Sequence, residues 1–196
     1  PKLLRKAGYV TGMFGKWGLG APKSSGDPMN QGWDEFFGYN CQRQAHTFYP
    51  KHLWHNSEKV MLDGKTYSHD LIQEKALQFI RDNEKKPFFA YLPLTIPHAA
   101  MQCPEEDVAP FRKKFSQFEN KIGKYSHGSI IRNPVAAFAG MMTRMDRGIG
   151  QILDLLNELD IAENTLVLFT SDNGPHYEGG HQPGFFNSNG PLKGHK

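Results

Sequence analysis

The sequence predicts an α/β fold with a largely parallel sheet, because helical patterns alternate along it with short apolar runs typical of buried strands. One such run, residues 165–170, stops abruptly at a polar turn, Ser171-Asp172-Asn173-Gly174. Another, residues 88–94, follows a helical pattern and the pair Lys86-Pro87. This alternation is the main evidence for the fold class.

The sequence of the amino-terminal third predicts few regular secondary-structure elements. Residues 1–8 are typical of a helix that ends at Gly8, and residues 9–14 of a strand whose following loop carries Lys16. Residues 21–65 are rich in Gly, Pro, Asn, His and aromatic side chains without periodicity, which predicts a long excursion with short elements.

Helical periodicity is clearest in two later segments. In residues 70–83, apolar side chains share one face and Asp70 is the predicted cap. In residues 134–159, apolar residues recur at spacings of three and four, and Met142 and Met145 are predicted core residues. The polar, lysine-rich residues 105–132 between them predict a surface loop with one short helix.

Composition excludes several classes of function. The 196 residues carry a net charge of only +3, with no basic block and no motif that reads RNA or DNA, so we expect no nucleic-acid partner. No run approaches the roughly 20 apolar residues of a membrane-spanning helix, so we expect no membrane segment. Two cysteines in unrelated contexts indicate no disulfide framework.

Polar side chains follow three predicted strands, at Lys16, at His98 and at the pair Asp172 and Asn173. Ligands bind outside the carboxyl ends of strands in open α/β sheets, so this pattern predicts a site. Carboxylate and amide oxygens suit Ca²⁺ better than zinc, with Mg²⁺ the second choice, but two residues cannot complete the shell. Taken singly, the pair is better explained as a turn, and Lys16 and His98 are better explained as ordinary loop residues.

Four ordered segments together resemble the sulfatase family: residues 4–20 (LRKAGYVTGMFGKWGLG), 87–98 (PFFAYLPLTIPH), 169–174 (FTSDNG) and 190–196 (GPLKGHK). The resemblance implies an alkaline-phosphatase-like fold, a largely parallel central sheet flanked by helices, and sulfuric ester hydrolysis. It also implies that residues 1–196 are one partial catalytic domain, lacking an amino-terminal nucleophile segment and a carboxyl-terminal part.

The family nucleophile is a formylglycine made from a Cys/Ser-x-Pro-x-Arg motif, which this chain does not contain. The resemblance therefore implies a nucleophile upstream of Pro1, paired Asp metal ligands beside it, and an inactive fragment. It assigns Asp172 and Asn173 to a Ca²⁺ ion, Lys16 to the formylglycine and the sulfate, and Lys196 and His98 to the sulfate and the leaving-group oxygen. His98 is then the expected general acid.

One position departs from the family pattern, because many sulfatases have histidine where this chain has Gly18. Its role is either vacant or filled by another group, for which His46, His176 and His181 are candidates. These histidines and Arg43 are also predicted to bind substrate. Tyr49 and Trp54 are further candidates for stacking on a sugar, although packing explains Trp54 equally well.

The resemblance implies a sulfated carbohydrate or other sulfate ester as substrate and a formylglycine-generating or sulfatase-maturating enzyme as partner. It also implies an exported, periplasmic, extracellular or lysosomal location. Two alternatives stay open: a phosphoester or phosphonate hydrolase of the same superfamily, and a non-catalytic binder of sulfated glycans.

Overall fold

The computed structural model describes residues 1–196 and divides into two compact units. The first unit contains Pro1–Thr95 and Gly150–Glu163, and the second contains Ile96–Ile149 and Asn164–Lys196. The predicted α/β class is confirmed, since helices alternate along the chain with the strands of a central sheet. No helix has the length and apolar character that crossing a membrane requires.

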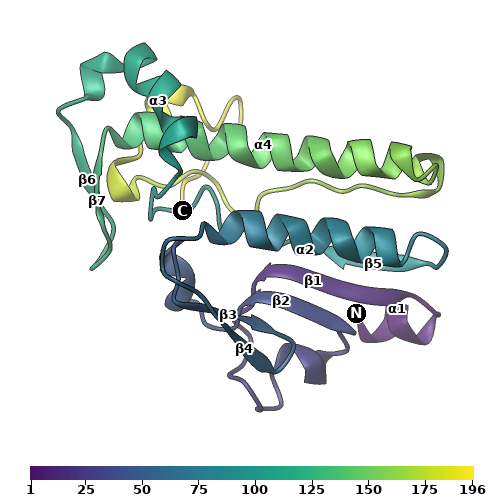
Figure 1. Ribbon diagram of the computed structural model, residues 1–196. Coiled ribbons are helices and arrows are strands. Elements are labelled where there is room, and N and C mark those ends of the chain that lie inside the picture. Colours follow the sequence, from purple (N-terminus) through teal and green to yellow (C-terminus); the bar gives the residue numbers. More distant parts are fainter. The chain divides into compact units, whose positions relative to one another are not determined.

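The first unit is built on a five-stranded sheet with the order β4-β3-β2-β1-β5 (Figure 1). Its strands are β1 (Val10–Lys16), β2 (Glu35–Tyr39), β3 (His52–His55), β4 (Glu58–Met61) and β5 (Phe88–Tyr91). Strand β1 pairs in parallel with both β2 and β5, whereas β3 pairs antiparallel with β2 and β4. The sheet is therefore mixed, with its parallel part at β2, β1 and β5.

Helix α2 (Ser68–Asp82) covers one face of this sheet, and its Phe79 packs against Phe14 of β1 with ring centroids 5.3 Å apart. A Cβ atom on Gly12 would lie only 2.8 Å from the Phe79 ring, so the small residue permits this close approach. The predicted cap at Asp70 is wrong, because the helix begins two residues earlier. Asp70 instead lies in the first turn, where a negative charge favours the helix dipole.

The other elements of the first unit are short. Helix α1 (Lys2–Lys6) precedes β1, and single 3-10 turns η1 (Pro28–Gln31) and η2 (Gln44–His46) lie in the excursion. This excursion also holds β2, β3 and β4, which the aperiodic composition concealed. The predicted strand at 88–94 forms only over Phe88–Tyr91 and is partly exposed.

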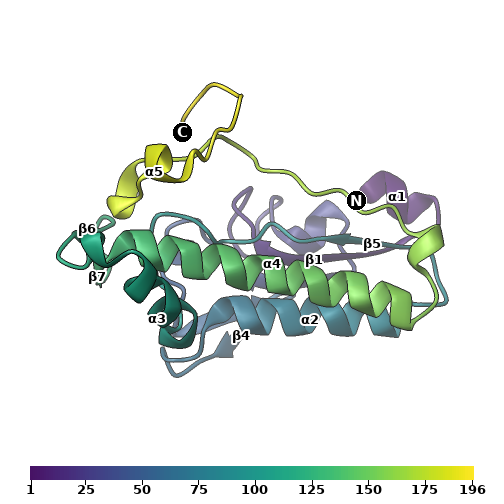
Figure 2. The same cartoon turned by 90° about the horizontal axis from the view of Figure 1, so that it is seen from above.

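The second unit contains α3 (Glu105–Lys114), the hairpin of β6 (Ile122–Lys124) and β7 (Ile130–Arg132), and α5 (Pro183–Phe186). Helix α4 (Pro134–Glu158) begins in this unit and confirms the helix predicted at 134–159 (Figure 2). Three 3-10 turns complete the chain: η3 (Ser116–Phe118), η4 (Ala162–Asn164) and η5 (Glu178–Gly180).

Two details of the prediction are wrong in these regions. Residues 165–170 form no strand, and all of them except the half-buried Thr165 are exposed. A strand requires hydrogen bonds to a neighbouring strand, and none pairs with this segment. Met142 is 37% exposed and lies outside the core, whereas the adjacent Met141 is fully buried and Met145 is buried as predicted.

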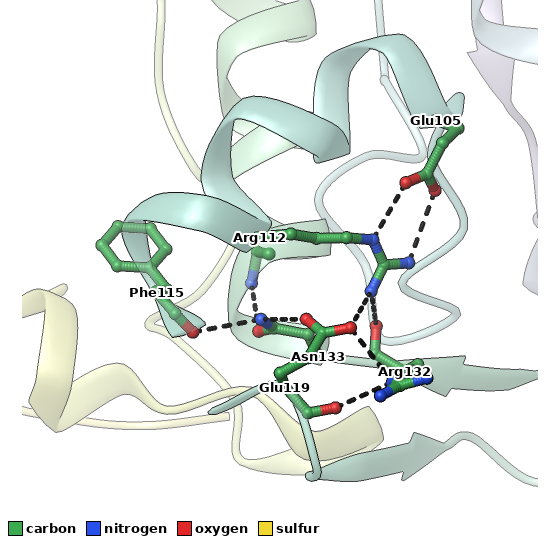
Figure 3. A network of polar contacts seen from close by, with 7 residues as sticks. Glu105, Arg112, Phe115, Glu119, Arg132 and Asn133 are labelled. Atoms are coloured by element: carbon green, nitrogen blue, oxygen red, sulfur yellow. Dashed lines mark hydrogen bonds and ion pairs between the residues drawn. The ribbon is translucent and has the colours of Figure 1, made fainter. Parts of the chain in front are cut away.

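A polar network fixes the start of α4 (Figure 3). The Asn133 side chain donates to the Phe115 carbonyl and to Glu119, and its oxygen accepts from the Ala136 backbone N–H at 3.0 Å. It is therefore the amino-terminal cap of the helix. Arg112 of α3 binds both Glu105 and Glu119 and also donates to the Arg132 carbonyl of β7 at 3.2 Å, so α3 and the hairpin are held at the same helix end.

Candidate functional site

Lys16 is the last residue of β1, and the backbone holds it from both sides. Its N–H donates to the Pro93 carbonyl at 2.9 Å, and the next N–H, of Trp17, donates to the Tyr39 carbonyl at 2.8 Å. The Trp17 indole also donates to the Gly26 carbonyl at 2.9 Å. The half-buried Lys16 is thus at the carboxyl end of the parallel strands, as predicted.

Two buried polar side chains that the sequence did not indicate lie near the same strand ends. Asn40 directly follows β2 and is 4% exposed, yet neither end of its carboxamide has a hydrogen-bond partner. Thr95 follows β5, is 5% exposed, and its hydroxyl is likewise unpartnered. Buried polar groups are normally hydrogen-bonded, so these positions suit a bound water or ligand. No sequence signal indicated Asn40, because the strand β2 that precedes it was itself concealed.

The space beside Gly18 is occupied by Gln42. A Cβ atom on Gly18 would lie 2.5 Å from the Gln42 side-chain nitrogen. The Gln42 carboxamide therefore fills part of the volume that a larger residue at position 18 would need. Three histidines were predicted to take over the role of the histidine that is absent at position 18, and of these only His46 belongs to the first unit, together with Gly18.

The other residues of the first unit that were predicted to contact a sugar differ in how far they are packed into the fold. Arg43 is exposed and precedes the short turn η2, while His46 at the end of that turn is half-buried. Trp54 packs against a buried aromatic cluster, and the Lys59 ammonium lies 5.5 Å from its ring centroid.

His98 belongs to the second unit and has aromatic neighbours. Its ring centroid lies 5.3 Å from that of Tyr125 in an edge arrangement and 6.2 Å from that of His176. The structure thus brings together two histidines that are far apart in the sequence. Their proximity places His176 near the predicted general acid.

His181 is buried behind His176, with ring centroids 5.2 Å apart and only 1% of the residue exposed. Phe138 and Phe186 pack against its ring. Burial, and to a lesser extent the nearby His176, lowers the pKa of His181 to about 4, so this imidazole is neutral near neutral pH. Direct contact between His181 and a sugar would require this packing to open.

Asp172 and Asn173 lie on an exposed turn. The Asn173 amide nitrogen donates to the Gly174 carbonyl at 2.8 Å, which leaves the amide oxygen available as a ligand. The pair offers hard oxygen donors that suit Ca²⁺, but no group of three or more His, Cys, Asp or Glu side chains is arranged to hold a metal ion. These two residues therefore fit part of a calcium shell.

The end of the chain folds back beside this turn. The Lys196 N–H donates to the Pro175 carbonyl at 3.1 Å, two residues after Asn173, and the Tyr177 hydroxyl lies 3.1 Å from the His195 ring nitrogen. The second unit therefore brings Lys196 close in the fold to the Asp-Asn turn and to His176. Lys16, Arg43 and His46 belong to the first unit.

The family described as Sulfatase matches this chain over residues 1–196. The chain is 32% identical to human N-acetylgalactosamine-6-sulfatase over 98% of its own length and 35% of that protein. It is 28% identical to an uncharacterized sulfatase of Schizosaccharomyces pombe, over 89% of the chain and 40% of that protein.

A solved structure also resembles the chain closely. Ps i-CgsB, crystallised in complex with k-i-k-neocarrahexaose, matches with a TM-score of 0.72 and 28% identity over 92% of this chain and 41% of that one. A putative sulfatase from Bacteroides fragilis, with a TM-score of 0.66 and 21% identity, supports the fold alone. The chain thus spans 35% to 43% of the length of these relatives.

Proposed function

The chain belongs to the sulfatase family, and on that premise we propose that the protein of which it forms part hydrolyses sulfate esters on carbohydrates. The observation that carries the proposal is that the turn of Asp172 and Asn173 lies in the same unit as His98 and Lys196. The segment after this turn contacts both: His176 lies beside His98, and Pro175 accepts from the Lys196 N–H. Asp172 and Asn173 offer oxygen ligands for a cation, and His98 and Lys196 are groups suited to binding a sulfate ester. A carbohydrate substrate is supported by a relative named N-acetylgalactosamine-6-sulfatase and by another that was crystallised in complex with k-i-k-neocarrahexaose.

In this proposal Asp172 and Asn173 provide two ligands of a Ca²⁺ ion, and the others come from parts of the protein outside this chain. When bound, the ion would supply positive charge to the sulfate oxygens and to the nucleophile. The nucleophile is proposed to be a formylglycine outside residues 1–196, installed by a maturating enzyme. An exported or lysosomal location stays a prediction.

The residues of this chain then have distinct tasks. Lys16 and Lys196 bind sulfate oxygens, whose negative charge they offset more strongly in a pocket from which water is excluded. As the bond between sulfur and the ester oxygen breaks, His98 donates a proton to that oxygen, so that an alcohol leaves instead of an alkoxide. Arg43 and His46 remain candidates for holding the sugar, whereas His176 and His181 pack against one another, with ring centroids 5.2 Å apart, and His181 is 1% exposed.

The test uses the full-length protein, produced together with a formylglycine-generating enzyme and supplied with Ca²⁺. We expect inorganic sulfate to be released from sulfated saccharides, and Lys16→Ala to abolish most of the release. Phosphate release from phosphoesters without sulfate release would favour the phosphoester hydrolase. Binding of sulfated saccharides without any hydrolysis would favour the non-catalytic binder.

A further inference from the structure

His176 occupies the middle of a row of three histidines, with His98 on one side and His181 on the other. The ring centroids are 6.2 Å apart in the first pair and 5.2 Å in the second. All three residues belong to the second unit.

The His176 ring contacts the residue directly before His98. Its Nε2 atom lies 3.5 Å from the Pro97 carbonyl oxygen, at the outer limit of a hydrogen bond. A carbonyl only accepts, so this contact requires the proton on Nε2 and leaves Nδ1 as an acceptor. That Nδ1 atom is buried and has no hydrogen-bond partner.

The turn that links His176 to His181 is packed against the segment that follows His98. Gly179 has a φ angle of +64°, and a Cβ atom there would lie 3.2 Å from the Ala99 carbonyl carbon. Glycine is therefore needed both for the left-handed backbone and for the close approach. A Cβ atom on the next residue, Gly180, would lie 2.5 Å from the Pro134 side chain, so the start of α4 supports the turn.

His181 provides a rigid base for the middle histidine. It is wedged against Phe138, with ring centroids 3.8 Å apart, and stacked near Phe186 at 6.0 Å. Both of its nitrogens are buried without partners. Its packing restricts where the His176 ring can move.

We propose that His176 is a positioning residue, which anchors Pro97 through Nε2 and so fixes the orientation in which His98 donates its proton. His181 contributes by holding His176 in place, which explains why a nearly inaccessible histidine lies next to the candidate site. This inference rests on the proposed function for the role of His98. It assigns His176 and His181 to the support of the acid and not to the grip on the sugar.

The test compares leaving groups in the full-length protein. A sugar sulfate needs its leaving oxygen protonated, whereas an activated aryl sulfate does not. General acids contribute about 10²- to 10⁴-fold, so we expect His176→Phe to lower kcat on the sugar sulfate about 10- to 100-fold and to leave the aryl sulfate nearly unchanged. His176→Gln, which can place a donor near the Nε2 position, should restore most of the lost rate.

Two further variants separate positioning from a general loss of structure. His98→Ala combined with His176→Phe should be no slower than His98→Ala alone, because the positioned group is already absent. The exposed His127→Phe is the matched control and should behave as wild type. Multiplicative losses in the double variant, or equal losses on the two substrates, would overturn the proposal.

A wild-type protein that releases sulfate from neither substrate would instead remove the proposed function. The positioning role is then decided by crystal structures of the wild type and His176→Phe. Displacement of Pro97 and His98 in the variant supports it, and an unchanged segment overturns it.

Discussion

The loop after β1 and the loop after residues 165–170 both follow apolar runs, but they are held in different ways. Lys16 ends a strand with partners on both sides, so the sheet backbone places it. Before Asp172, by contrast, Leu166 is 83% and Leu168 82% exposed. An apolar, β-rich sequence therefore becomes a strand only where a neighbouring strand satisfies its backbone hydrogen bonds.

The largest contrast should appear in stability. Phe79→Ala removes a ring buried against β1 and should destabilise the 196-residue chain by about 3–5 kcal/mol. Leu168→Ala should change stability by less than about 0.5 kcal/mol, because the side chain is already in water. Urea unfolding of both variants measures the difference. Comparable losses would mean that residues 165–170 are packed in solution.

The same contrast limits what the sequence could predict. Helix α4 was found almost to the residue, because its periodicity persists over 25 residues. Strands β2, β3 and β4 were missed, since four- and five-residue strands among Gly, Pro and His leave too short a pattern. The strand at 165–170 was overpredicted, because the local sequence carries no information about its partner.

The candidate site shows the same division. Lys16 was placed at a strand end because a strand and its following loop are local features. The approach of His176 to His98, 78 positions apart, depends on the Gly179 backbone packing against Ala99, which no local pattern reveals. Burial of His181 and of Asn40 likewise became visible only in three dimensions.

The two loops should also differ in their chemistry. In the full-length protein, Asp172→Ala should weaken Ca²⁺ binding by at least about 100-fold, because direct ligands contribute at least as much as the residues that orient them. Lys16→Ala should slow sulfate release and leave Ca²⁺ affinity unchanged. Calorimetric titration with Ca²⁺ measures the Ca²⁺ affinity of both variants, with the exposed Asp154→Ala as control. Equal Ca²⁺ affinity in Asp172→Ala and wild type would contradict the ligand assignment.

The third prediction concerns pH and applies to the second unit. His181 has a pKa of about 4 in the folded chain against an ordinary value of 6.5, so the unfolded chain binds the proton more readily. Its contribution to stability is therefore complete above pH 6.5 and is lost as the pH falls toward 4. Linkage predicts a loss of about 2 kcal/mol between pH 7 and pH 5.

Urea unfolding at the two pH values tests this prediction. His181→Phe should remove most of the dependence, because phenylalanine keeps an aromatic ring beside Phe138 and Phe186 and cannot take up a proton. The same slope in His181→Phe and wild type would show that other groups cause the acid sensitivity.

The smallest expected effect lies beside Lys16. Gly18→Ala would bring a methyl group to 2.5 Å from the Gln42 amide nitrogen, but this is the end of a flexible side chain that can move away. We expect a loss of about 1 kcal/mol or less in the free energy of unfolding. In a Gln42→Ala background the same substitution should cost nothing, because the space is then open, and the double-mutant cycle isolates that coupling. An additive cycle would mean that Gln42 does not occupy the volume beside Gly18. The loop after β1 would then be less firmly packed than its contrast with the loop after residues 165–170 requires.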